Sequence, residues 1–207
     1  MVALLVLIAY LLGSIPTSVW IGKAFYNIDV REFGSGNAGA TNTFRVLGKN
    51  AGIPVLIIDI LKGTLAVALA YFSGFEINST EFINLQLGLG IAALIGHIFP
   101  VFAGFRGGKG VATILGIVIC ILPLASSLAL IVFLVVLFST RIVSLSSMLA
   151  GVSFPLVLNF LLGNQNPVLT VFSIVVAALL IVTHRKNIKR LLSNEESKVQ
   201  LFQAKNK

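Results

Sequence analysis

The sequence has few charged residues and a single cysteine. Only 11% of its 207 residues are charged and 57% are hydrophobic, with a mean hydropathy of +1.01. A typical soluble domain carries about 25% charged residues, so this chain could not hide its apolar surface from water, and we expect an integral membrane protein. Cys120 lies alone in an apolar run, which excludes an intramolecular disulfide and leaves the redox compartment open.

Basic residues are missing from the start of the chain. The segment VALLVLIAYLLGSIPTSVW has no positive residue before its apolar part, so we expect a retained membrane span rather than a secretory signal. The net charge is nevertheless +8. In a membrane protein, that charge points to loops and anionic partners such as lipid, and we expect no nucleic-acid partner.

Several apolar segments reach the roughly 20 residues that a membrane-crossing helix needs. They are 3–22, 51–72, 85–104, 142–162 and 168–183. The run 110–139 is long for one helix and short for two. Pro123 near its middle would break or kink a helix.

Lys and Arg are absent from two connectors, 73–84 and 163–167. Because positive residues favour the cytoplasmic side of short loops, these two connectors are expected outside. If 110–139 turns as a tight hairpin near Pro123, every basic segment faces the cytoplasm. Those segments are 23–50, Arg106 with Lys109, Arg141 and the tail from Arg185.

This charge distribution predicts an all-α integral membrane bundle of seven transmembrane helices, with the amino terminus outside and the carboxyl terminus cytoplasmic. No linker suggests a boundary, so residues 1–207 are predicted to form a single domain, with 193–207 a mobile cytoplasmic tail. The polar segments then meet at one membrane face, where they could share a site.

The first polar segment is FGSGNAGATNTFRVLG, Phe33 to Gly48. It matches G-x-G-x-x-G formally, but no βαβ unit surrounds it, so dinucleotide binding is rejected. Its glycines let backbone N–H groups approach an anion, and Arg45 offers a planar cationic fork. An ordinary loop of turn-forming residues is the alternative. The candidate donors are Ser35, Gly36, Asn37, Thr41 and Asn42.

The second polar segment is GHIFPVFAGFRGGKGVAT, Gly96 to Thr113. It is not a Walker A loop, because Ala103 stands where the first glycine belongs and Gly110 follows Lys109. Free N–H groups before the apolar helix could still hold an anion, with Lys109 as a point charge. A tight turn with an interfacial cation is the alternative, and the nearby His97 favours a site. The glycines concerned are Gly107, Gly108 and Gly110.

Asp59 and Lys62 lie inside an apolar segment, at a spacing that places them on one helical face. Ionisable groups at that depth usually face a bundle interior or a polar cavity, although a purely structural pair remains an alternative. The last polar segment, HRKNIKR, aligns His184, Asn187 and Arg190 on one side of a helix. A lipid-contacting basic flank is the alternative there.

These blocks together, with DILKG at 59–63, resemble the bacterial acyl-phosphate:glycerol-3-phosphate acyltransferases over nearly the whole chain. Thr183 and Asn194 stand where that family usually has Arg and Gly, with Glu196 as the match to its final Glu. The resemblance implies transfer of a fatty acyl group from acyl phosphate to the 1-hydroxyl of glycerol 3-phosphate, giving lysophosphatidic acid and phosphate. It also implies a bacterial cytoplasmic (inner) membrane location and an active site facing the cytoplasm.

The resemblance assigns site residues to these positions. Glycerol 3-phosphate is expected near Ser35, Arg45, His184 and Asn187, and acyl phosphate against the 107–110 loop, with Asn37, Thr41 and Asn42 as further donors. The expected catalytic residues are Ser35, Arg45, His97, Lys109, His184 and Asn187, and the expected substrate-binding residues are Gly36, Asn37, Thr41, Asn42, Asp59, Lys62, Gly107, Gly108, Gly110, Ser144 and Arg190. No cofactor and no metal are expected, since no His/Cys/carboxylate cluster is evident, and a monomer is the expected form.

The expected chemistry is positioning, phosphate charge neutralisation and stabilisation of an oxyanion, because acyl phosphate is an activated mixed anhydride. His97, His184, Asp59 or a substrate phosphate oxygen could remove the proton from the acceptor hydroxyl. Many thioester-dependent glycerolipid acyltransferases have Asp four residues after His, but Val101 and Ile188 occupy those positions here. No sequence-adjacent base would activate Ser35 as a covalent nucleophile.

Two other functions are compatible with the same composition. A transporter for a phosphorylated metabolite would explain ionisable residues inside a span, although such folds usually show internal repeats and a midplane site. A non-enzymatic assembly factor could use the basic loops on anionic lipid, but would leave the glycine, asparagine and histidine blocks unexplained.

Overall fold

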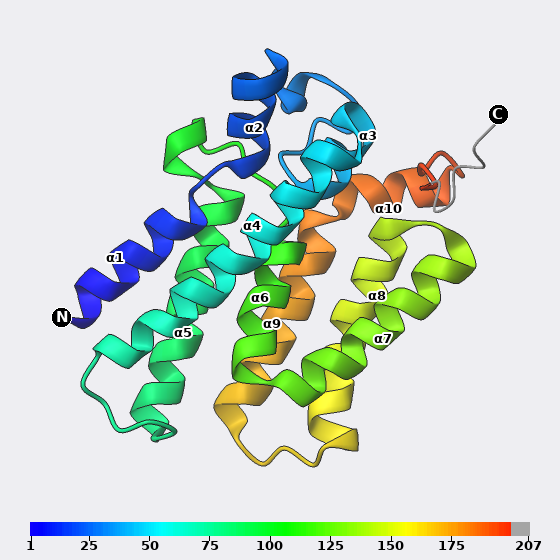
Figure 1. Cartoon of the computed structure of the whole chain (residues 1–207). Helices are drawn as coiled ribbons and strands as arrows, with labels where there is room; N and C mark the ends of the chain where they lie inside the picture. The colour runs from blue at the N-terminus through cyan, green and yellow to red at the C-terminus, as the bar shows by residue number, and fades with distance from the viewer. Residues whose placement is uncertain (200–207) are drawn as a thin grey trace. The chain divides into compact units, whose positions relative to one another are not determined.

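The computed structural model describes residues 1–199, and within that range all regular structure is helical (Figure 1). This confirms the all-α prediction. The chain divides into two compact units, Met1–Pro123 and the part from Leu124 onwards. Each unit is described by itself below.

The first unit contains six α-helices and three short 3₁₀ turns. Its central element is α4, which contacts α1, α2, α3, α5 and α6. The elements are α1 (Val2–Gly13), α2 (Thr17–Tyr26), η1 (Val30–Glu32), α3 (Ala40–Leu47), α4 (Lys49–Ala68), η2 (Leu69–Phe72), α5 (Thr80–Ile98), η3 (Val101–Ala103) and α6 (Val111–Ile121).

The first apolar segment is a bent pair rather than one straight helix. α1 and α2 meet at 42°, and Pro16, which cannot donate a backbone hydrogen bond, precedes Thr17 at the break. The break leaves the carbonyl of Ile15 outside the regular helix ladder, where it accepts a hydrogen bond from Lys62 Nζ at 3.0 Å. The bend therefore supplies one wall of the site described below.

α4 and α6 cross at two glycines. A Cβ at Gly63 would lie 2.3 Å from the Thr113 carbonyl oxygen, and one at Gly116 would lie 2.0 Å from the Ile60 carbonyl oxygen. Small residues of this kind let membrane helices approach closely. The Thr64 hydroxyl donates to the Gly116 carbonyl at 3.0 Å across the same crossing, so α6 itself is held closely against α4.

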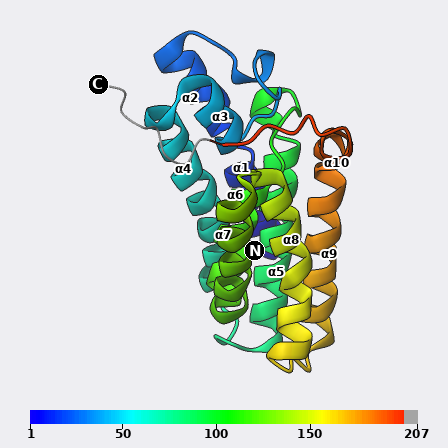
Figure 2. The same cartoon turned by 90° about the vertical axis from the view of Figure 1, so that its right-hand side faces the viewer.

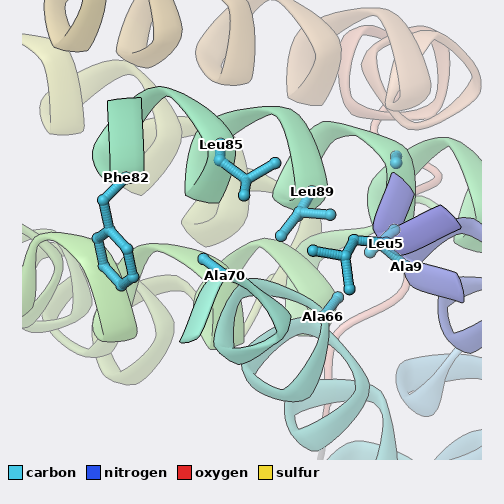
Figure 3. Close-up of a cluster of buried hydrophobic side chains, with 9 residues drawn as sticks. Leu5, Ala9, Ala66, Ala70, Phe82, Leu85 and Leu89 are labelled. Atoms are coloured by element: carbon cyan, nitrogen blue, oxygen red, sulfur yellow. The ribbon is translucent and has the colours of Figure 1, made fainter. Parts of the chain in front are cut away.

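The apolar core of this unit lies where α1, α4 and α5 meet (Figure 3). Phe82, Leu85 and Leu89 of α5 point toward small residues on the facing helices. The small partners are Ala9 of α1, Ala66 of α4 and Ala70 of η2. Large side chains of α5 thus pack against alanines of the facing helices, the interdigitation that is typical of close-packed protein cores.

The described part of the second unit contains four α-helices. α8 and α9 are its main packed pair, with α10 continuing from α9 at an angle of 59°; Figure 2 shows α8 and α9 side by side. The elements are α7 (Pro123–Thr140), α8 (Val143–Leu156), the π-helical turn η4 (Val157–Leu161), α9 (Pro167–Thr183) and α10 (Arg185–Leu192).

Four helical segments are long and apolar enough to cross a membrane, and up to six are if each bent pair counts as one span. The run that begins near residue 110 is divided, as predicted: α6 ends at Ile121 and α7 begins at Pro123. α6 is apolar but shorter than the others. Each expected span thus corresponds to a helix or bent helix pair in the described residues.

The tail begins inside the described residues. Glu196 is hydrogen-bonded to side chains of its own unit, and the Val199 N–H donates to the Arg141 carbonyl at 2.8 Å. Residues 200–207 lie outside the described residues. The mobility expected for 193–207 therefore stays a prediction.

Candidate functional site

The loop that contains Ser35 is organised by a buried amide. Asn42 is 1% exposed, and its Nδ2 donates to the carbonyls of Val30 at 2.8 Å and Phe33 at 3.1 Å. Its Oδ1 accepts from the Ser35 N–H at 2.8 Å and from the Ser35 hydroxyl at 3.1 Å. Asn42 was expected to donate to a substrate, but the structure uses its donors and its acceptor to hold the loop.

The other polar residues of this first block remain near the surface. Arg45 is exposed and makes no hydrogen bond or ion pair within residues 1–199. Asn37 and Thr41 are half-buried beside the start of α3, and Gly36 has a positive φ of 71°. Arg45 thus stays a candidate anion partner, because none of the described side chains neutralises it.

The glycines of the second block pack directly on the end of α5. The Gly107 N–H donates to the Ile98 carbonyl at 3.2 Å, and the Gly108 N–H donates to the His97 carbonyl at 3.1 Å. A Cβ at Gly107 would lie 2.0 Å from the His97 carbonyl oxygen. The sequence predicted that these amides would face an anion, whereas here both are directed at α5.

The remaining candidate donors of this block lie further along the chain, where α6 begins. Gly110 caps α6 with a φ of 86°, a conformation that glycine adopts without strain. The first N–H groups of any α-helix lack acceptors within the helix, and the positive end of the helix dipole points the same way. Lys109 precedes this helix end with a half-buried side chain, so this cation and the helix end lie together.

Beneath the loops, Asp59 and Lys62 form the ion pair that their spacing predicted. Lys62 Nζ lies 2.9 Å from Asp59 Oδ1, and both side chains are less than 5% exposed. The Thr17 hydroxyl donates to the same carboxylate oxygen at 3.2 Å, and Lys62 also donates to the Ile15 carbonyl. Each buried charge is therefore compensated, which a buried ion pair requires.

His97 joins this network through its other neighbours. Its Nδ1 lies 3.1 Å from the Thr113 hydroxyl and 3.9 Å from Asp59 Oδ1. A Cβ at Gly108 would lie 2.2 Å from His97 Nε2. The imidazole therefore stands between the Asp59–Lys62 pair and the glycine loop.

A small hollow connects these groups and brings the first two polar blocks together. Ala38 of the first block and Gly108 of the second both line it, and a Cβ at Gly108 would lie 2.9 Å from the Ala38 carbonyl oxygen. Segments about 70 residues apart in sequence thus meet at one end of the first unit. The lining residues are Ile15, Pro16, Thr17, Ala38, Asp59, Lys62, His97, Pro100, Gly107 and Gly108.

The sequence did not predict a contact, outside the hollow, between the second block and the short segment just before the first block. Arg31 forms a two-pronged ion pair with Asp29, with Nε to Oδ1 at 2.9 Å and Nη2 to Oδ2 at 2.7 Å. Its Nη1 donates to the carbonyls of Ala103 and Arg106. The bonds from Arg31 hold the pKa of Asp29 well below its usual range. The D-x-R spacing in NIDVREF was the available signal.

In the second unit, the candidate substrate donors gather on a carboxylate of the protein itself. Glu196 Oε1 accepts from the Ser144 hydroxyl at 2.7 Å and Asn187 Nδ2 at 2.6 Å, while Oε2 accepts from Arg190 Nε at 2.6 Å. Burial alone would raise the pKa of Glu196, but these hydrogen bonds together lower it. The matching of Glu196 to the family's final Glu pointed to this residue, but not to its contacts.

His184 lies buried at the junction of α9 and α10. Its Nδ1 lies 2.7 Å from the Leu180 carbonyl oxygen. Because a carbonyl can only accept, Nδ1 carries the proton, and in the neutral imidazole Nε2 is then an acceptor.

The described residues thus bring together catalytic and substrate-binding candidates in two separate sets. The first unit unites the Ser35 loop, the 107–110 loop and the Asp59–Lys62–His97 network. The second unites Ser144, Asn187 and Arg190 around Glu196. Within residues 1–199, no group of three or more His, Cys, Asp or Glu is arranged to hold a metal ion.

Known proteins resemble this chain over nearly its whole length. Residues 3–194 match the family model described as glycerol-3-phosphate acyltransferase. A glycerol-3-phosphate acyltransferase of Enterococcus faecalis is 45% identical over 206 residues, which cover 96% of this chain and 92% of that protein. One from Listeria monocytogenes is 48% identical over 197 residues, which cover 95% and 96%.

A solved structure matches closely as well. It is the crystal structure of PlsY (YgiH), an integral membrane glycerol 3-phosphate acyltransferase, in its glycerol 3-phosphate form. The match has a TM-score of 0.86 at 42% identity and covers 98% of this chain and 99% of that one. The lysophosphatidic acid form of the same protein matches with a TM-score of 0.82 at 40% identity, over 96% and 95%.

Proposed function

The chain belongs to the glycerol-3-phosphate acyltransferase family, and from that premise we propose that its acyl donor is an acyl phosphate. The acyl group passes to the 1-hydroxyl of glycerol 3-phosphate, giving lysophosphatidic acid and inorganic phosphate. The solved relatives, whose two forms carry glycerol 3-phosphate and lysophosphatidic acid, support this acceptor and this product.

The reaction asks little covalent chemistry of the protein. The acceptor oxygen attacks the acyl carbonyl carbon, the bond from that carbon to the phosphate oxygen breaks, and the acceptor proton leaves with the phosphate. The protein must bring two anions together, neutralise them and stabilise the tetrahedral oxyanion. Exposed Arg45 and the Lys109–α6 helix end are the cationic groups of the first unit suited to that task.

The observation that carries the proposal is the meeting of the two polar blocks at Ala38 and Gly108, above the Asp59–Lys62–His97 network. One block offers the Ser35 hydroxyl and Arg45, and the other offers Lys109. Two phosphate-bearing substrates need two neighbouring cationic binding sites. A single anion site would not require both blocks.

The proton acceptor is proposed to be a phosphate oxygen of the substrate. Asp59 already accepts from Lys62 and Thr17, and so is a poor base. His97 contacts Thr113 through Nδ1 and packs against Gly108, which favours a positioning role. The departing phosphate, in contrast, lies beside the attacking hydroxyl by necessity.

The membrane arrangement is proposed as seven spans with the amino terminus outside and the site on the cytoplasmic side of a bacterial cytoplasmic membrane. Up to six spans are long enough to cross a membrane, and the shorter apolar helix α6, which begins directly after the glycine loop, would be the additional one. The basic residues of loops 23–50 and 106–109 support this orientation. The roles of His184, Asn187, Ser144 and Arg190 rest on the resemblance and stay predictions, as do a single acyltransferase domain and a monomer.

The test uses protein purified in detergent, with palmitoyl phosphate and labelled glycerol 3-phosphate, and scores labelled lysophosphatidic acid. Palmitoyl-CoA serves as the parallel donor. We expect product from the acyl phosphate and none from the thioester. Product from the thioester alone would overturn the donor assignment while keeping the acceptor.

A transporter function is tested on the same preparation in vesicles. Uptake of labelled glycerol 3-phosphate without conversion would contradict the enzymatic proposal. Accessibility labelling of a cysteine introduced at Lys49, after replacing Cys120, checks the orientation, which is wrong if only an outside reagent reacts.

A further inference from the structure

We propose that Arg31 is a positioning residue for the reaction, which fixes the 103–110 loop so that Lys109 and the start of α6 meet the phosphate of a substrate. The inference rests on the proposed function for the identity of that phosphate. The contacts of Arg31 stand independently of it.

The guanidinium of Arg31 is held in a defined orientation by Asp29, independently of its bonds to the 103–110 loop. Asp29 binds it at two points, and Asp29 Oδ1 also accepts the Arg31 backbone N–H at 3.0 Å. The Arg31 and Asp29 side chains are only 14% and 11% exposed. Two parallel charge-assisted bonds define the plane of a guanidinium as well as its place, and they leave Nη1 directed away from the carboxylate.

That nitrogen holds a turn of unfavourable backbone conformation. Gly104 and Phe105 have φ of 62° and 58°, and a bulky residue rarely adopts positive φ unless its surroundings enforce it. Arg31 Nη1 donates to the carbonyl at each end of this turn, Ala103 at 2.8 Å and Arg106 at 3.2 Å. The guanidinium therefore closes the turn.

The closed turn determines where the next residues lie. Arg106 is followed by Gly107 and Gly108, whose N–H groups pair with the last carbonyls of α5. Lys109 comes next, immediately before the α6 helix end. With the chain fixed at both 106 and 108, the approach of Lys109 is set by the turn.

Arg31 also links this turn to the Ser35 loop. The carbonyl of the preceding residue, Val30, accepts from Asn42, the amide that holds Ser35. Adjacent residues of η1 thus engage the two polar blocks. No charge on Arg31 itself needs to reach a substrate, since Asp29 neutralises it.

Lysine cannot replace this arrangement, because an ammonium is a point charge and cannot hold a carboxylate at two points while donating to two carbonyls. We therefore expect Arg31→Lys to raise the KM of one phosphate substrate about tenfold, with kcat within about twofold. Asp29→Asn keeps the guanidinium but removes the carboxylate that orients it. We expect this variant to raise the same KM, by a smaller factor.

The matched control is Lys23→Gln. Lys23 approaches the same carboxylate, with Nζ 3.5 Å from Asp29 Oδ2, but its side chain is 60% exposed, and among the described residues it makes no hydrogen bond or ion pair with the 103–110 loop. Its removal should change neither KM. Two results would overturn the proposal. Equal KM values in Arg31→Lys and wild type would mean that Arg31 does not position a substrate-binding group. A fall in kcat together with a fall in melting temperature would mean that Arg31 only stabilises the fold.

A second measurement needs no substrate. Arg106 is exposed, and the carbonyl that Arg31 binds belongs to the bond that trypsin cuts after Arg106. We expect that bond to be cleaved about fivefold faster in Arg31→Gln than in wild type or Lys23→Gln. An unchanged cleavage rate would contradict the inference that Arg31 holds the turn at residues 103–106. Absence of turnover with acyl phosphate in the wild type instead contradicts the proposed function.

Discussion

Gly108 lies against the imidazole of His97, close enough that a single methyl group could not fit between them. Its N–H donates to the His97 carbonyl at 3.1 Å, and a Cβ at Gly108 would lie 2.2 Å from His97 Nε2. The position of the glycine loop is therefore coupled to the position of the buried Asp59–Lys62–His97 network. A change in either must move the other.

Gly108→Ala is expected to reduce kcat/KM about 100-fold, since displacing positioning groups by about 1 Å can cost that much. The added methyl would also lie 2.9 Å from the Ala38 carbonyl oxygen. The 107–110 loop therefore cannot relieve the clash with His97 by shifting toward the first block. Steady-state kinetics with palmitoyl phosphate and glycerol 3-phosphate measure the loss.

The control for this change is Gly88→Ala, in α5 like His97, where a Cβ would meet nothing within 4 Å. Activity there should stay at the wild-type level. If Gly108→Ala behaved like Gly88→Ala, the close contact with His97 would have no bearing on catalysis.

Asp59→Asn should destabilise the protein strongly, because it leaves the ammonium of Lys62 buried without the negative charge that compensates it. Breaking a buried pair by removing one partner costs about 3–5 kcal/mol. Thermal unfolding in detergent measures the loss. The double variant Asp59→Asn/Lys62→Met removes both charges, and we expect it to recover much of the stability.

Activity in that double variant separates structure from function. If the pair serves the reaction, turnover stays low although the fold is restored. Full recovery of turnover would make Asp59 and Lys62 a purely structural pair, the alternative that the sequence left open.

More of the fold and of the residue types of the candidate site could be predicted from the sequence than of the contacts that these residues make. Apolar length and the positions of Lys and Arg indicated a helical membrane protein, and the i, i+3 spacing indicated the Asp59–Lys62 pair, because these features depend on local periodicity. The direction of a side chain in a loop does not. Asn42 was expected to face a substrate and instead braces Ser35, and Gly107 and Gly108 direct their amides at α5.

The same limit explains why Arg31 and Glu196 were underestimated. From the sequence, Arg31 is only one of the positive charges of the 23–50 segment, because no local pattern links it to Ala103, 72 residues away. Glu196 gathers Ser144 from 52 residues away. Long-range hydrogen bonds in loops carry no periodic signal, so only the folded chain reveals them.

Arg45→Ala should raise the KM of one phosphate substrate at least about tenfold, the loss expected for a charge-assisted hydrogen bond. Because Arg45 is exposed and makes no hydrogen bond or ion pair within residues 1–199, the melting temperature should stay within about 1 °C. Lys49→Ala, an exposed cation four residues on, is the control and should leave both KM values unchanged. A fall in stability without a change in KM would remove Arg45 from the site.

Activity is expected to survive chelation, since positioning and cationic side chains suffice for an activated mixed anhydride. The assay is run with EDTA and then with added Mg²⁺, Mn²⁺ or Zn²⁺. Loss of turnover in EDTA that a divalent ion restores would overturn this prediction.

The stability of the second unit should depend on pH through Glu196. Its pKa lies below the ordinary value near 4.5, because hydrogen bonds from Arg190, Asn187 and Ser144 outweigh the effect of burial. A lowered pKa means that the stabilisation is complete above pH 4.5 and disappears as the pH falls through the lowered value. Glu196→Gln should therefore melt several degrees below wild type at pH 7, and the difference should shrink below pH 4.5.

Glu195→Gln is the matched control, since the neighbouring carboxylate is exposed and makes no side-chain hydrogen bond or ion pair within residues 1–199. Its melting curve should follow wild type at every pH. A constant difference between Glu196→Gln and wild type from pH 7 to pH 3.5 would mean that the charge of Glu196 is not what holds the tail. The loss in Glu196→Gln would then come from replacing one acceptor oxygen by an NH₂ group, and the start of the tail would depend on acceptor geometry rather than on an ion pair with Arg190.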